Sequence, residues 1–211
     1  MCWSATADLV AGVCVGVVGV ACVAQVRDGR DLPLAALPLL LGAHQIVESA
    51  VWSSGGGSGP ATVAWAVIAL PLLAVWVPVG VWCAAPPRVR TRLTVLLGVG
   101  VATAALLAHA LATGPVTAEI RGRTVGYTLG LSHPGLLVAG YLLATVGSLL
   151  LSGDRRLVLL GALAAVGALV CWILWRLEFI STWCALAALC SAVLLGWVRA
   201  RRAVSSHHAV P

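Results

Sequence analysis

The sequence has little charge. Only 9% of its 211 residues are Asp, Glu, Lys or Arg, whereas 61% are hydrophobic and the mean hydropathy is +1.03. A water-soluble domain carries about a quarter of its residues as these four charged types. We therefore exclude a soluble globular domain and expect a lipid bilayer to surround most of the molecular surface.

Lysine and asparagine are absent, and all 13 basic residues are arginine. Without lysine the chain cannot form a Schiff base with retinal or pyridoxal phosphate, and it cannot contain a P-loop. Without asparagine it has no N-glycosylation sequon. The net charge of +6 does not indicate nucleic-acid binding, because the arginines lie in twos and threes between apolar runs, as topology determinants do.

Apolar stretches of about 20 residues, long enough to cross the hydrocarbon core of a bilayer, follow one another along the chain. Seven spans are expected, at residues 4–26, 31–52, 60–84, 92–113, 132–153, 154–176 and 178–198. The expected helix caps are Ser4, Asp31 and Asp154, and Pro71 and Pro78 should kink the third span. We therefore predict an all-α, polytopic membrane helix bundle of about seven transmembrane helices, forming one domain over residues 1–198.

The division between the last two spans rests on length alone, since no Gly or Pro lies between Gly167 and Gly196. One helix over residues 155–198 would be about 66 Å long, roughly twice the thickness of the bilayer core. Six spans, or a re-entrant segment, is the alternative arrangement.

The distribution of arginine between the loops predicts how the chain is oriented in the membrane. The loops after the first, third and fifth spans and the C-terminal tail contain ten arginines: Arg27, Arg30, Arg88, Arg90, Arg92, Arg155, Arg156, Arg199, Arg201 and Arg202. The opposite side has Arg121, Arg123 and Arg176. The positive-inside rule therefore predicts a multi-pass plasma-membrane protein with its N-terminus outside and a basic, disordered cytoplasmic tail at residues 199–211.

The longest loop, residues 114–131, shows strand-like alternation around Gly122. The alternating apolar residues are Val116, Ala118 and Ile120 before the turn, and Val125, Tyr127 and Leu129 after it. This pattern predicts a short hairpin lid over the outer end of the bundle.

Titratable residues inside spans are expensive to bury, so they are the first candidates for a functional site. His44, Gln45 and Glu48 lie in the second span, where Glu48 is one helical turn, about 6 Å, from His44 on the same face. By the same arithmetic His109, Cys171, Thr182 and Cys184 fall in one outer-leaflet layer. This layer predicts a pocket that binds a small ligand, a proton or a metal, although hydrogen bonding between helices would also explain polar residues there.

Three histidines on the outer half, His44, His109 and His133, would suit zinc, with Glu48 as the base that activates a bound water. The alternative function is therefore an intramembrane metal-dependent hydrolase acting on a lipid. Enzymes of the alkaline ceramidase type resemble this scheme, but they place two histidines one turn apart in their last helix. The last span here contains no histidine.

The cysteines number seven and include no CxxC motif. Cys2, Cys171 and Cys184 lie on the side expected to be oxidising, where Cys2 could act as a chelate or nucleophile or form a disulfide with Cys184. The alternative is that all three are structural or unpaired, because a disulfide requires geometry that a sequence does not provide.

Several motifs resemble a family of uncharacterised multi-pass bacterial membrane proteins. Members begin with Met-Cys-(Trp or Phe)-Ser-Ala, as residues 1–5 do, and carry Gln-x-x-Glu and Trp in the second span, as Gln45, Glu48 and Trp52 do. The pair Trp183 and Cys184 is similar to the family's C-terminal element. The resemblance implies no activity, and the Ala/Val/Gly/Leu richness and arginine-only basicity are similar to those of a high-GC actinobacterium.

The sequence thus predicts a membrane protein whose partners are the bilayer and a small molecule or lipid, with no nucleic acid. Whether it is an enzyme, which ligand it binds and how it oligomerises are left open.

Overall fold

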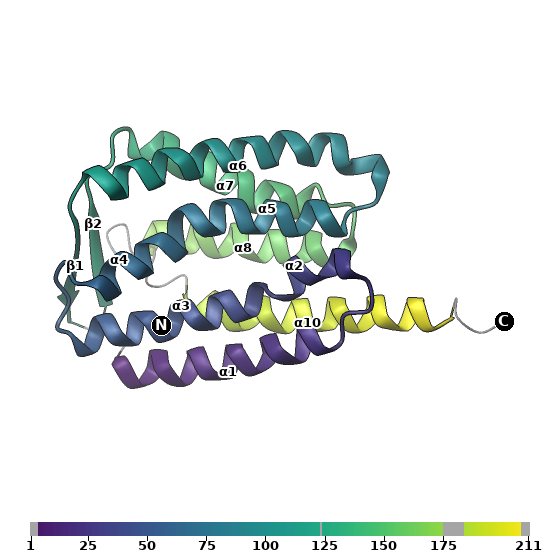
Figure 1. The fold of residues 1–211 in the computed structure, drawn as a ribbon, viewed down its shortest axis with the longest axis horizontal. Helices are drawn as coiled ribbons and strands as arrows, with labels where there is room; N and C mark the ends of the chain where they lie inside the picture. The colour runs from purple at the N-terminus through teal and green to yellow at the C-terminus, as the bar shows by residue number, and fades with distance from the viewer. Residues whose placement is uncertain (1–3, 123, 175–183, 208–211) are drawn as a thin grey trace.

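The computed structural model describes residues 4–122, 124–174 and 184–207. Seven helical rods in these described residues run side by side along the long axis of the molecule, and their connections collect at its two ends (Figure 1). Each rod overlaps one of the seven stretches that the apolar pattern predicts. The sequence-based expectation of a mainly helical bundle is confirmed.

The first rod is α1 (Ala5–Ala24), and Ser4 caps it as predicted, because the Ser4 hydroxyl oxygen accepts a hydrogen bond from the Ala7 amide at 3.2 Å. The second rod has three parts, the 3-10 turn η1 (Gly29–Asp31), α2 (Leu32–Ala35) and α3 (Leu37–Ser53). The interruption at Ala36 lies two residues before Pro38, whose ring cannot fit against the carbonyl four residues back in a regular helix.

The third rod also changes its geometry at a proline. It consists of α4 (Pro60–Val67), a π-helical segment η2 (Ile68–Leu72) that contains Pro71, and α5 (Leu73–Ala84). Pro78 lies inside α5, which continues through it as an α-helix. The fourth rod, α6 (Pro87–Thr113), begins five residues earlier than the predicted span, because Pro87 suits the first turn of a helix.

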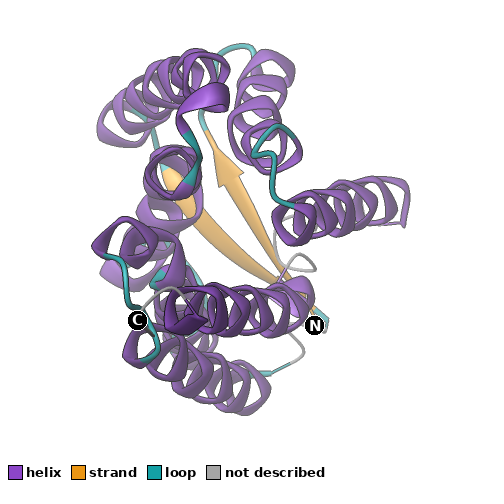
Figure 2. Ribbon diagram, turned by 90° about the vertical axis from the view of Figure 1, so that its right-hand side faces the viewer, coloured by secondary structure: helices purple, strands orange, loops and turns teal. Residues whose placement is uncertain are grey.

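The predicted hairpin is present. Strands β1 (Val116–Arg121) and β2 (Thr124–Leu129) pair antiparallel, with Val116 opposite Leu129 and Arg121 opposite Thr124. An isolated bridge joins Gly57 to Ala118. Viewed along the helices, the strands lie across the bundle (Figure 2), and Val116, Ala118 and Val125 pack against Val51 and Trp65. The hairpin therefore covers one end of the bundle, which we call the hairpin end.

The last three rods are α7 (Pro134–Leu150), α8 (Arg155–Leu174) and α10 (Cys184–His207). Asp154 caps α8 as predicted, since its Oδ1 accepts from the Arg156 amide at 2.9 Å. Helix α10 continues to His207, through the segment expected to be a disordered tail. It gains support there because the guanidinium of Arg201 lies 5.5 Å from the ring centre of Trp197 and pairs with Asp31.

Asp31 does not act as the cap that the sequence predicts, because its carboxylate has another partner. It accepts hydrogen bonds from Arg201 Nη2 at 2.7 Å and Nε at 3.0 Å, while Arg201 Nη2 also donates to the Ala84 carbonyl. These bonds raise the pKa of the Arg201 guanidinium above its ordinary value, so the group stays charged throughout the physiological range. This ion pair joins the loop after the first rod to the last helix, at the end we call the arginine end.

Candidate functional site

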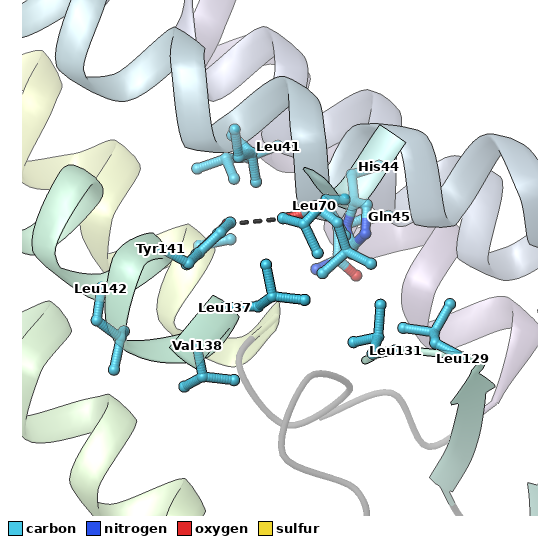
Figure 3. Close-up of a pocket in the computed structure, with 14 residues that line it drawn as sticks. Leu41, His44, Gln45, Leu70, Leu129, Leu131, Leu137, Val138, Tyr141 and Leu142 are labelled. Carbon is cyan, nitrogen blue, oxygen red and sulfur yellow. Dashed lines mark hydrogen bonds between the residues drawn. The ribbon is translucent and has the colours of Figure 1, made fainter. Parts of the chain in front are cut away.

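A cavity of about 140 Å³ lies in the half of the bundle nearer the hairpin (Figure 3). Its wall comes from α3, α5, α6, α7, α10, the π-helical segment and the hairpin end, and we call it the hairpin-side cavity. The lining residues are Leu41, His44, Gln45, Ala69, Leu70, Leu73, Leu107, Leu129, Leu131, Leu137, Val138, Tyr141, Leu142 and Ala187. Three of them carry polar side chains, namely His44, Gln45 and Tyr141, and none carries a fixed charge.

Helix α3 carries the three polar residues that the sequence singled out in the second span, and two of them line the cavity. His44 and Gln45 lie on the buried face of α3, with 6% and 2% of their surface exposed. Glu48, one turn further on, is fully buried, so the side chains of His44 and Glu48 both face protein. Glu48 is not among the residues that line the cavity. The buried positions therefore agree with an inward-facing polar stripe on this helix.

The polar atoms of His44 and Gln45 lack protein partners. His44 Nε2 is buried and has no hydrogen bond, and the Gln45 amide has none to any residue in the described part of the chain. Figure 3 shows both side chains directed toward the leucines of the cavity wall. Buried polar groups are nearly always hydrogen-bonded, so two adjacent groups without partners beside a cavity require an explanation.

The π-helical segment that contains Pro71 forms another part of the wall. The Leu73 amide donates to the carbonyl of Ile68, five residues back, instead of following the α-helical pattern. Within this segment the Ala69 carbonyl accepts a hydrogen bond from the Tyr141 hydroxyl at 2.9 Å. Tyr141 therefore enters the cavity with its hydroxyl already occupied. Single π-helical turns occur frequently at functional sites.

An aromatic stack connects His44 to the hairpin. The His44 ring lies 5.1 Å from that of Trp65, centre to centre, and Trp65 stacks on Tyr127 at 3.5 Å with an interplanar angle of 3°. Trp65 is fully buried. The stack fixes one face of the imidazole through packing, so the ring is held in place without a hydrogen bond at Nε2.

Of the remaining predicted site residues, two histidines are described with their side chains, and both are exposed. His109 is exposed on α6, and His133, at the start of α7, is exposed with a φ of 60°. Among the residues that the structure describes, no group of three or more His, Cys, Asp or Glu side chains could hold a metal ion. Cys2 and Thr182 lie outside the described residues, whereas Cys171 and Cys184 lie in helices α8 and α10 but their side chains are not described.

Sequence reasoning overlooked Tyr141 and Trp65 at this site, and also the buried Asp8 on α1. Tyr141 and the π-helical turn were not predicted to shape it, and Trp65 was not recognised as the support for His44. Asp8 was also missed, although it is fully buried on α1. A carboxylate in an otherwise apolar span was the available signal for Asp8.

Comparison with known proteins identifies the family to which the chain belongs. No curated protein and no solved structure is significantly similar to the chain. The sequence profile of a family of unknown function, DUF6629, matches residues 1–209, which is nearly the whole chain. The chain therefore belongs to the DUF6629 family.

Proposed function

We propose that this protein is an integral membrane protein whose hairpin-side cavity binds a small, neutral, largely apolar molecule through one hydrogen-bonding group. The observation that carries the proposal is the buried His44 Nε2, which has no hydrogen-bond partner, beside the Gln45 amide in an otherwise apolar cavity.

Membrane placement is supported by length and by surface chemistry. Within the described residues, four helical stretches are long and apolar enough to cross a bilayer: Ala5–Ala24, Gly29–Ser53, Pro60–Ala84 and Pro87–Thr113. Large apolar side chains also project outward, with Val17 on α1 64% exposed, Val95 on α6 65% and Val166 on α8 60%. Water-soluble monomers rarely expose extensive apolar surface, whereas lipid solvates it.

The proposed orientation of the bundle in the membrane rests on the positions of the arginines. The ten arginines assigned to the cytoplasmic side lie at the arginine end, in the connection after α1, in the first two turns of α6, at the start of α8 or toward the end of α10. With that end in the cytoplasm, the hairpin and the cavity beside it belong to the outward half of the bundle. The N-terminus is then outside and the C-terminus inside.

The wall determines the ligand's chemistry. A cavity of about 150 Å³ in another protein accommodates benzene, so 140 Å³ suits one small ring or a short length of chain. No charged side chain lines it, so an ionised ligand would lose its hydration without gaining a counter-charge. The imidazole and amide can each donate or accept a hydrogen bond, and a hydroxyl, carbonyl or amide on the ligand would satisfy them.

The proposal is tested by thermal unfolding of the purified protein in detergent with phenol, and with toluene as its apolar counterpart of the same shape. At about ten times its Kd, phenol should raise the Tm of the wild type by roughly 3–6 °C. The His44→Leu and Gln45→Leu variants should lose most of this shift. His109→Leu, which alters an exposed histidine outside the cavity wall, should retain it.

Two results would contradict the proposal. Equal stabilisation by toluene and phenol, unaffected by His44→Leu, would make the cavity an apolar void with no polar recognition. Identical phenol shifts in His44→Leu and His109→Leu would place phenol elsewhere, for instance in the detergent shell.

A further inference from the structure

A second cavity, of about 320 Å³, lies at the arginine end, far along the helices from the hairpin-side cavity. The loop before α2, the link between α5 and α6, the link between α7 and α8, and helix α10 surround it (Figure 1). Its charged lining residues are Asp28, Arg30, Arg88, Arg90, Asp154 and Arg201. Segments distant in sequence thus bring four guanidinium groups and two carboxylates around one space.

The carboxylates of this cavity are already engaged. Asp154 Oδ1 accepts from the Arg156 amide at 2.9 Å, and its Oδ2 accepts from Trp197 Nε1 at 3.1 Å. Asp28 Oδ1 accepts from the Arg30 amide at 3.0 Å. Arg201 is neutralised by Asp31. The acidic groups are therefore committed to capping helices and turns, and one arginine to an ion pair.

The other three arginines of the cavity make fewer polar contacts than Arg201 does. Arg90 donates from Nε to the Ala85 carbonyl at 3.2 Å and lies 5.2 Å from the Trp82 ring centre. The side chains of Arg30 and Arg88 have no hydrogen bond or ion pair with any described residue. Arg88 also lies in the first turn of α6, which has no capping side chain. The cavity thus presents two unpaired guanidinium groups and an uncapped helix turn.

We propose that this arginine-end cavity binds a phosphate group through Arg30 and Arg88. A guanidinium offers a planar fork of donors that matches phosphate oxygens, and two forks from different loops would hold one phosphate from two sides. The dipole of the long helix α6 favours negative charge at the same place. The phosphate is either the head group of an anionic lipid or a free phosphate or phosphomonoester, and the two sources share this chemistry.

The test measures thermal unfolding of the full chain in two arms. In a neutral detergent, inorganic phosphate is compared with chloride at equal ionic strength. In nanodiscs, phosphatidylcholine alone is compared with phosphatidylcholine containing phosphatidylglycerol. In the arm that matches the natural source, the wild type should be stabilised, and the apparent affinity should fall about tenfold in Arg30→Gln and in Arg88→Gln.

Arg27→Gln is the matched control, because Arg27 is exposed in the same loop as Arg30 and does not line the cavity. It should behave as the wild type does. Stabilisation by inorganic phosphate assigns the site to free phosphate, whereas stabilisation by phosphatidylglycerol alone assigns it to a lipid head group. Arg88→Lys distinguishes the effect of the planar guanidinium from the effect of charge. It keeps the positive charge, so its affinity for phosphate should lie between those of Arg88→Gln and the wild type.

Two outcomes would overturn the inference. Equal loss in Arg27→Gln and Arg30→Gln would show that only the general positive charge of this end attracts anions. No stabilisation in either arm would show that the cavity does not bind phosphate. Neither outcome depends on ligand binding at the hairpin-side cavity, so the two proposals fail separately.

Discussion

At the scale of single residues, the hairpin-side cavity has His44 Nε2 in its wall, a buried atom that lacks the hydrogen bond that buried polar atoms normally make. Ser49, one turn beyond Gln45 on α3, behaves in the ordinary way and donates to the Ala5 carbonyl at 2.7 Å. The contrast distinguishes a side chain that stabilises the fold from side chains that we propose bind a ligand.

Replacing Gln45 by Leu should therefore leave stability within about 1 kcal/mol of the wild type, because no hydrogen bond in the described chain is lost and an unsatisfied amide is removed. Ser49→Ala should lower the free energy of unfolding by about 0.6 kcal/mol or more, because the hydrogen bond from the Ser49 hydroxyl to α1 is lost. The free energy of unfolding from detergent, measured for both variants without added ligand, checks the pair. A loss above about 2 kcal/mol in Gln45→Leu would mean that the amide is structural.

The sequence predicted a pocket beside the polar residues of α3 but not the apolar residues that form its wall. Polar side chains in an apolar run are visible in a sequence because burying them is costly, and His44, Gln45 and Glu48 are indeed buried. The rest of the wall consists of leucines that look like any other leucines in this chain. They line a cavity only because rods distant in sequence pack around them.

At the scale of elements, the backbones of α1 and α3 approach each other closely at their glycines. A Cβ placed on Gly12 would lie 2.8 Å from Cγ1 of Ile46 and 2.9 Å from the Gly42 carbonyl oxygen. One on Gly42 would lie 2.8 Å from both the Gly12 oxygen and the Gly16 nitrogen. Small residues at such crossings let backbones meet, and in membranes this packing replaces the hydrophobic driving force. It also holds the buried stripe of α3 in position.

Gly12→Ala should lower the free energy of unfolding by about 1–3 kcal/mol, because the added methyl group must displace the backbone of α3 or the side chain of Ile46. Gly16→Ala, on the same helix, should be neutral or stabilising by up to about 1 kcal/mol, because its Cβ meets open space and alanine favours helix. Thermal unfolding of both variants compares them directly. Equal stability of the two would contradict the close packing of α1 on α3.

Helix ends show where local prediction succeeds and where it fails. Ser4 and Asp154 cap the helices that follow them, as local sequence predicts. Asp31 looks the same in sequence, but its carboxylate binds Arg201, 170 residues away. The pairing is set by the packing of α10 against α2, which lies beyond any local pattern. The same contacts explain why α10 extends into the expected tail.

At the scale of the whole molecule, the two ends differ in chemistry. The hairpin end holds an aromatic stack and a nearly apolar cavity, and the arginine end holds paired carboxylates and unpaired guanidinium groups. If the bundle crosses a membrane as arginine placement predicts, the first cavity belongs to the outward half and the second to the cytoplasmic surface. The bilayer orientation is therefore the central claim on which both assignments of sides depend.

The most direct test of that claim is the accessibility of single introduced cysteines to a membrane-impermeant maleimide polymer, read as a mass shift relative to the unsubstituted chain. Ser58 is exposed in the loop beside the hairpin, and Ala203 is exposed near the end of α10, so the two test variants are Ser58→Cys and Ala203→Cys. The account predicts that Ser58→Cys is modified in intact cells and that Ala203→Cys is modified only after permeabilisation. The reverse pattern, or equal labelling of both in intact cells, would contradict it.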